Sequence, residues 1–240
     1  SIRRQRQMCI RDRNFTAANI GIFLAGIASN GPMLLLPLFF QNTKGFTAVE
    51  AGLMLIPQGL GMMVTRPLIG KMIDRMGARP VVLVSLAISL LGTLPFIFVH
   101  ENTNLIWLGL VLFVRGMGIG GLQMPMMTDI FIGLDKQDIP GASVGQRIIQ
   151  NVGSSFGSAV ISAVVTAVVT SEIAGQMTTK LHQLAAMHTN LTPTVIAKAK
   201  TSVEKAVTLN GYQLGFLVSS IVLIVIAIPA MFLSQKKVNK

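Results

Sequence analysis

The chain has 240 residues, of which 51% are hydrophobic and 12% are charged, about half the charged share of an average soluble domain. Most charges lie in short clusters between apolar runs of about 20 residues, the pattern of a membrane protein with several transmembrane helices. Of the net charge of +11, +4 comes from residues 1–13 and most of the remainder is dispersed over connecting segments. There is no basic face with interleaved aromatic residues. We therefore exclude nucleic acid as a partner.

The first thirteen residues, Ser1–Arg13, are basic and contain no apolar run. They look like translated sequencing-adapter DNA, and we expect them to be a foreign leader. Residues 14–240 would then be a fragment of a longer protein. The alternative, a native basic arm, stays open. The single cysteine, Cys9, excludes an internal disulfide framework and a thiolate metal cluster.

Six apolar segments follow, and each is long enough to cross a bilayer as a helix, since a helix satisfies its own backbone groups in lipid. The predicted spans are Phe15–Phe40, Ala48–Gly70, Val81–Val99, Leu105–Met127, Ile148–Thr170 and Leu214–Leu233. We expect the first span to be broken at Asn30-Gly31-Pro32, because proline cannot donate a backbone hydrogen bond.

A long segment, residues 171–211, separates the last two spans. Apolar residues repeat there at helical spacing, first at Ile173, Met177, Leu181 and Leu184, and then at Val195, Ile196, Ala199, Val203 and Val207. Thr192-Pro193 is typical of a helix start. We expect two amphipathic helices that rest on the membrane surface or on the rim of the protein. We favour a packing role for them over a binding role.

The basic residues of the short connections predict the orientation. Lys71, Arg75 and Arg79 follow the second span, and Lys236, Lys237 and Lys240 follow the sixth. The short connections on the opposite side carry one lysine, Lys44. The positive-inside rule then places both termini in the cytoplasm and residues 171–211 outside it.

Amides and charges within the predicted spans are unevenly distributed. They occur in or directly before the first, second, fourth and fifth spans, and include Asn19, Asn30, Gln58, Arg66, Arg115, Gln123, Gln146, Arg147, Gln150 and Asn151. The third and sixth spans have none. Because such groups must face protein or water at membrane depth, we expect spans one, two, four and five to be central and to line a cavity. Spans three and six would be peripheral, and the pattern repeats after three spans.

Arg115 is the strongest single candidate for a functional residue, because a charge near the middle of a span is costly unless it faces water or a partner. It would contact substrate or act in proton coupling, or else bond backbone carbonyls as a structural residue. Methionines on the central spans, including Met124, suit either an adaptable pocket or core packing. Gly153 and Gly157 form a G-x-x-x-G pattern that favours close helix packing.

The connection after the second span reads G-x-x-x-D-R-x-G-x-R, with Gly70, Asp74, Arg75, Gly77 and Arg79 at its defined positions. This pattern resembles the signature loop of the major facilitator superfamily. The resemblance implies a gate in which Asp74 meets the N-terminus of a neighbouring helix or an arginine when the cytoplasmic side is closed. The fold would be all-α and integral to the membrane, with six transmembrane helices forming the C-terminal half of that fold as a three-plus-three inverted repeat.

Further motifs look like the multidrug branch of that family: Leu36-Pro37-Leu38 with Gln41, Ala51-Gly52-Leu53, Pro57-Gln58-Gly59 and Gly141-Ala142-Ser143. They are similar to the last six spans of fourteen-span drug–proton antiporters of the EmrB/QacA type. The resemblance implies proton-driven efflux of lipophilic compounds across the inner membrane of a bacterium. The expected partners are membrane lipids, small lipophilic substrates and the N-terminal half, and an accessory efflux subunit is a further candidate.

We expect no cofactor, no metal and no enzymatic activity. The three histidines, His100, His182 and His188, fall in predicted extramembrane segments, and the sequence contains no phosphate-binding loop. Two other functions stay open. One is a transporter of the same fold for a defined metabolite or peptide, and the other is a receptor or scaffold without transport. The site residues expected from the whole analysis are Arg115, Gln123, Asn19, Asn30, Gln58 and Met124 for the cavity, with the signature residues for the gate.

Overall fold

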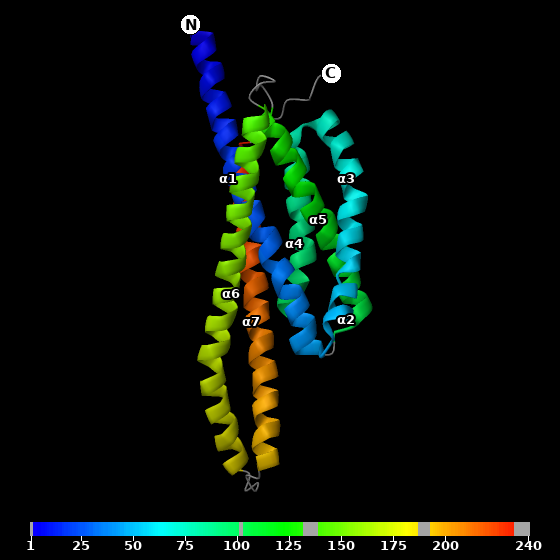
Figure 1. Cartoon of the computed structure of the whole chain (residues 1–240), viewed down its shortest axis with the longest axis vertical. Coiled ribbons are helices and arrows are strands. Elements are labelled where there is room, and N and C mark those ends of the chain that lie inside the picture. Colours follow the sequence, from blue (N-terminus) through cyan, green and yellow to red (C-terminus); the bar gives the residue numbers. More distant parts are fainter. Residues whose placement is uncertain (1, 101–102, 132–138, 187–192, 233–240) are drawn as a thin grey trace.

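The computed structural model describes residues 2–100, 103–131, 139–186 and 193–232, and its secondary structure within these ranges is entirely helical (Figure 1). The elements are α1 (Ile2–Lys44), α2 (Ala48–Leu53), α3 (Ile56–Met76), α4 (Ala78–Thr93), the short 3-10 helix η1 (Leu94–Phe98), α5 (Leu105–Phe131), α6 (Ile139–Ala186) and α7 (Pro193–Ala230). The prediction of an all-α protein is confirmed.

Six helical stretches in the described residues are long and apolar enough to cross a membrane. They are Ala18–Lys44, Ala48–Met76, Ala78–Phe98, Leu105–Met127, Ile139–Ile173 and Lys200–Ala230. Each overlaps one predicted span. The second consists of α2 and α3, and the third of α4 and η1. The predicted boundaries were too short for the fifth and sixth stretches, since polar turns continue these helices beyond the apolar run.

α1 continues through Asn30-Gly31-Pro32 without a break, so the predicted interruption is wrong. Pro32 cannot donate to the carbonyl oxygen of Ala28, one turn earlier. The hydroxyl of Ser219 on α7 donates to that oxygen instead, at 3.3 Å. A neighbouring helix thus satisfies the group that proline leaves open, which allows proline inside a membrane helix.

The helices pack in two groups, and each group combines helices from the beginning and the end of the chain or from its middle (Figure 1). α1 packs against α6 and α7, whereas α5 packs against α3 and α4, and the two groups meet through α1 with α5 and α4 with α7. If spans one to three form one repeat and spans four to six the other, the first helix of each repeat packs against the last two of the other. This relation is expected for two related three-helix repeats.

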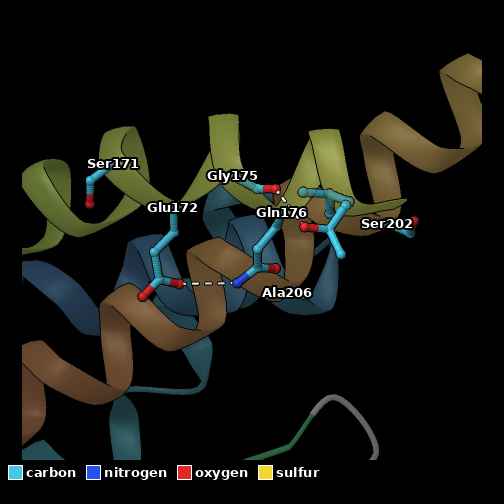
Figure 2. Close-up of a pocket in the computed structure, with 8 residues that line it drawn as sticks. Ser171, Glu172, Gly175, Gln176, Ser202 and Ala206 are labelled. Atoms are coloured by element: carbon cyan, nitrogen blue, oxygen red, sulfur yellow. Dashed lines mark hydrogen bonds between the residues drawn. The ribbon is translucent and has the colours of Figure 1, made fainter. Parts of the chain in front are cut away.

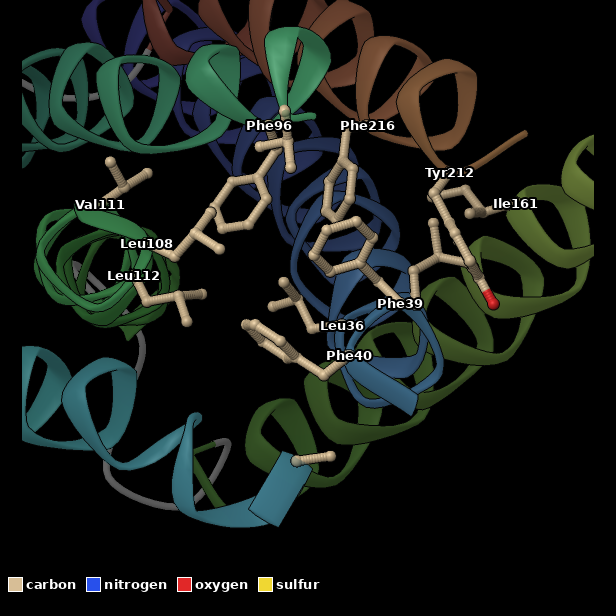
Figure 3. Close-up of a cluster of buried hydrophobic side chains, with 13 residues drawn as sticks. Leu36, Phe39, Phe40, Phe96, Leu108, Val111, Leu112, Ile161, Tyr212 and Phe216 are labelled. Atoms are coloured by element: carbon tan, nitrogen blue, oxygen red, sulfur yellow. The ribbon is translucent and has the colours of Figure 1, made fainter. Parts of the chain in front are cut away.

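Two apolar clusters fill the centre of the bundle. The larger, shown in Figure 3, is rich in aromatic side chains, and Phe96 of η1 lies against Phe216 of α7 with ring centroids 4.8 Å apart. The second contains Ile22 of α1, Leu122 of α5 and Ile226 of α7. Both clusters are built largely from the first, third, fourth and sixth spans.

The burial of the spans differs in part from the prediction. We compare the buried share of an apolar stretch of 18 residues in each span. Spans one and four are central, with 61% and 50% of these residues buried, and spans three and six have 44%. Spans two and five are the least buried, at 22% and 17%. A span without amides can face lipid but need not do so. In α4, Ser85, Ser89 and Gly92 pack against α5, so small residues bury a span predicted to be peripheral.

The segment 171–211 does not form separate helices lying across the bundle. α6 and α7 run through it as continuous helices of 48 and 38 residues and project together past the other helices (Figure 1). At about 1.5 Å per residue α6 is roughly 72 Å long, more than twice the thickness of a hydrocarbon core. The described part of α7 begins at Pro193, and Thr192, the predicted cap before it, lies outside the described residues.

Candidate functional site

A cavity of about 480 Å³ lies between four spans, within the size range of small-molecule sites. α1 contributes Ser29, Asn30 and Met33, α3 contributes Met62 and Arg66, α5 contributes Ile119, Gly120, Gln123, Met124 and Met127, and α6 contributes Gln146 and Gln150. These four helices belong to the first, second, fourth and fifth spans, for which the distribution of amides predicted a shared cavity.

The cavity wall combines amides, thioethers and one cation. Asn30 is fixed by hydrogen bonds from Nδ2 to the carbonyl oxygen of Gly26 at 3.3 Å and to Oγ of Ser154 on α6 at 2.7 Å. Arg66 is the only charged residue among those that line the cavity. Methionine side chains adapt to different shapes, so the wall can accept varied apolar molecules while the amides offer hydrogen bonds.

Arg115 lies between helices rather than in the cavity wall. Its side chain is 1% exposed, and Nη1 donates to Oε1 of Gln58 on α3 at 3.1 Å. Gln58 is also buried, and neither residue lines the cavity. Asn19, near the start of the first span, does not line it either. Of the six predicted cavity residues, Asn30, Gln123 and Met124 are brought together there.

The signature segment is mostly helical. Gly70, Asp74 and Arg75 belong to the last turns of α3, and Arg79 belongs to the first turn of α4. Gly77 alone joins the two helices, with φ 85° and ψ 171°. Asp74 and Arg75 are exposed, which leaves both charges accessible for contacts beyond this bundle.

Glycines bring the helix backbones together at two related interfaces. Gly153 and Gly157 of α6 lie against the backbone of α1 at Phe23 and Ile27. Gly61 of α3 lies against the backbone of α5 at Phe113 and Met117, and Gly116 of α5 lies against Gln58. Small residues at such contacts allow close approach in lipid.

Three further cavity residues, Arg66, Gln146 and Gln150, were among the polar residues that indicated the cavity-forming spans, although the sequence analysis did not choose them as site residues. It missed the other six, which are Ser29, Met33, Met62, Ile119, Gly120 and Met127. A signal for part of this set exists on α5, where Gly120, Gln123, Met124 and Met127 repeat at the three- and four-residue spacing of one helix face. Among the residues that the structure describes, no group of three His, Cys, Asp or Glu could hold a metal ion.

Comparison with known proteins decides the family. Residues 2–145, more than half of the chain, match the sequence profile of the Major Facilitator Superfamily. The chain belongs to this superfamily. Together with the six apolar helices, membership makes it a multi-pass membrane protein of a transporter family and not an enzyme.

Individual relatives are similar over about half of this chain. An uncharacterized MFS-type transporter of Bacillus subtilis, YcnB, is 33% identical over 123 residues, which are 51% of this chain and 26% of that protein. The multidrug resistance protein Stp of Mycobacterium tuberculosis is 34% identical over 119 residues, 49% of this chain and 22% of that protein. The lincomycin resistance protein LmrB of Listeria innocua is 26% identical over 138 residues, 58% and 29% of the two chains. The matched part therefore spans only about a quarter of the length of these relatives.

Proposed function

We propose that this chain is the C-terminal half of a proton-driven transporter that exports lipophilic drugs, of the fourteen-span EmrB/QacA type. The observation that carries the proposal is the cavity of methionines and amides between spans one, two, four and five. Such a wall suits molecules that differ in shape but share an apolar body. The names of relatives, which include multidrug and lincomycin resistance proteins, support the same substrate class.

In this proposal the cavity forms one side of a transport path in the inner membrane of a bacterium, with both termini in the cytoplasm. Transport follows from rocking of this half against the other, so the path opens to each side in turn. Arg66 gives this half of the cavity a positive charge. Carboxylates that bind protons and cationic drugs at membrane depth then belong to the N-terminal half.

The test uses the complete transporter in bacteria that lack their own drug pumps, loaded with the lipophilic dye ethidium. We expect Met62→Ala to slow energised efflux or change its dye preference. Met63→Ala is the matched control, because the neighbouring Met63 is 73% exposed and does not line the cavity. A protonophore should abolish efflux by the wild type. Efflux that persists without a proton gradient, or that is equal in both variants and the wild type, would contradict the proposal.

A further inference from the structure

A second cleft of about 500 Å³ lies between α6 and α7, where the two helices project past the rest of the bundle. α6 lines it with Ser171, Glu172, Gly175, Gln176 and Thr179, and α7 lines it with Ser202, Val203 and Ala206 (Figure 2). The α6 residues follow the spacing of one helix face. The cleft is separate from the cavity between the four spans and shares no lining residue with it.

The polar groups of the α6 wall present mainly hydrogen-bond acceptors to the cleft. The hydroxyl of Ser171 donates to the carbonyl oxygen of Val168 at 3.1 Å, and that of Thr179 donates to the carbonyl oxygen of Gly175 at 3.0 Å. Each hydroxyl has a single proton, so its remaining capacity is as an acceptor. A ligand for this wall must therefore bring its own N–H or O–H donors.

Glu172 supplies the negative charge of the cleft. Its Oε2 accepts from Nε2 of Gln176 at 3.1 Å and from Nδ2 of Asn210 on α7 at 3.5 Å. Both amides use the same carboxylate oxygen, so among the described residues Oε1 remains for a ligand, as does the amide oxygen of Gln176. In Figure 2, Glu172 and Gln176 extend from α6 toward α7 and are joined by this hydrogen bond.

The α7 wall consists of one polar residue, Ser202, and two aliphatic residues, Val203 and Ala206. Val203 and Ala206 contribute aliphatic surface, and apart from the two chain neighbours and the local backbone of α6 itself, nothing lies within 4 Å of the position that a Cβ on Gly175 would take. The charged residues of the described part of α7 near the cleft, Lys200, Glu204 and Lys205, are exposed and do not line it. A single carboxylate is too few ligands for a bound divalent metal, but it matches one organic cation.

We propose that this cleft binds amphiphilic organic ammonium ions, with the ammonium donating to Glu172 and the neighbouring acceptors and the apolar body resting against Val203 and Ala206. Assigning these cations to the exported compounds rests on the proposed function. Binding itself does not, because it can be measured at equilibrium without transport. The acidic residues of the described spans, Glu50, Asp74, Glu172 and Glu204, all lie within five residues of a span end. The cleft thus gives this half of the protein a cation site near the ends of the fifth and sixth spans.

The test is a fluorescence titration of the full chain in nanodiscs with dansylcadaverine, a primary ammonium on an apolar fluorophore. We expect saturable binding that weakens at least tenfold in Glu172→Gln. Gly175→Leu should also abolish it, because the new side chain occupies the open part of the cleft and replaces a helix-disfavouring glycine. Glu204→Gln is the matched control, an exposed acid of α7 outside the cleft, and should bind like the wild type.

Each other outcome overturns the proposal. If Glu172→Gln binds with wild-type affinity, the carboxylate does not hold the ammonium. If Gly175→Leu binds with wild-type affinity, the ligand does not bind in this cleft. If Glu204→Gln loses as much affinity as Glu172→Gln, the binding depends on the overall surface charge and not on this cleft. If N-acetylated dansylcadaverine, which lacks the positive charge, binds equally well, the cleft does not recognise the ammonium group. Loss of efflux in the complete transporter with dansylcadaverine binding intact would instead contradict the proposed function and leave this site standing.

Discussion

Arg115 of α5 donates from Nη1 to Oε1 of Gln58 of α3, at 3.1 Å, in the buried interior of the bundle. Nε and Nη2 of Arg115 have no hydrogen-bond partner among the residues that the structure describes. Gly92 of α4 lies beside the Arg115 backbone, so close that a Cβ there would be 2.5 Å from its nitrogen. The side-chain amide of Gln58 is thus the hydrogen-bond partner of the Arg115 guanidinium, which is buried among α3, α4 and α5.

This contact predicts a strong dependence of Arg115 on Gln58. Gln58→Leu should lower the free energy of unfolding by about 1.5–3 kcal/mol, because it removes a hydrogen bond to a buried charge. Arg115→Met in the same background should recover most of that loss, since both polar partners are then replaced by apolar groups. Thermal unfolding of the four proteins in detergent measures the coupling. Additive effects of the two changes would show that the pair is not linked.

The junction between α3 and α4 predicts opposite effects at two glycines of the signature. Gly77→Ala should cost about 1–3 kcal/mol, because φ 85° with ψ 171° is a backbone region that only glycine adopts without strain. Gly70→Ala is the control: Gly70 is helical with open space around a Cβ, so alanine should be neutral or stabilise by about 0.5–1 kcal/mol. The midpoint of thermal unfolding distinguishes them, and equal shifts would contradict the prediction.

The α1–α6 interface predicts a position-dependent cost of alanine along α6. A Cβ on Gly157 would lie 2.5 Å from Cα of Ile27 and 2.9 Å from its carbonyl oxygen, so the helices must separate. We expect a loss of about 1–3 kcal/mol, typical of overpacking. Gly145→Ala, on the same helix with nothing within 4 Å, should be tolerated. Comparable unfolding midpoints for the two variants would mean that α1 and α6 do not pack closely at Gly157.

The hydroxyl of Ser219 predicts a coupling to Pro32 across α1 and α7. Ser219→Ala should cost on the order of 0.6 kcal/mol, the average for an interhelical hydrogen bond in a membrane protein, because the carbonyl oxygen of Ala28 loses its donor. In a Pro32→Ala background the restored helical N–H can bond that oxygen, and the cost should shrink. Ser220→Ala is the control, since Ser220 donates within its own helix, to Phe216. An unchanged cost in both backgrounds would argue against the coupling.

The sequence predicted the helices and the cavity-forming spans better than the faces of the helices. Amides at membrane depth identify a span that faces protein or water, but both Gln123 and Arg115 satisfy that condition. At about 100° per residue, eight residues rotate Arg115 roughly 80° around α5 from Gln123, enough to move it from the cavity wall into the contact with α3. Which side faces the cavity depends on the neighbouring helices, and the span's own sequence does not contain that information.

Contacts with neighbouring helices also explain why the sequence analysis predicted a break in α1 and separate helices in residues 171–211. The break predicted at Pro32 assumed that α1 must satisfy its own carbonyl oxygens, yet Ser219 supplies the donor from a distant part of the chain. For residues 171–211, the repeat of apolar positions correctly indicated helices. It could not show that these helices continue the spans, because an amphipathic stripe packs equally well against a membrane surface and against a partner helix.

The packing of α1 against α6 and α7 has a consequence for the insertion of the chain into the membrane. α3, α4 and α5 are neighbours in sequence and in space, so they can associate as each leaves the ribosome. α1 precedes them, but its main neighbours, α6 and α7, are synthesised after α5. Until then Asn30 lacks Ser154 and the carbonyl oxygen of Ala28 lacks Ser219. The earliest of the described spans therefore stays in the bilayer with these polar groups uncovered until α6 and α7 have been inserted.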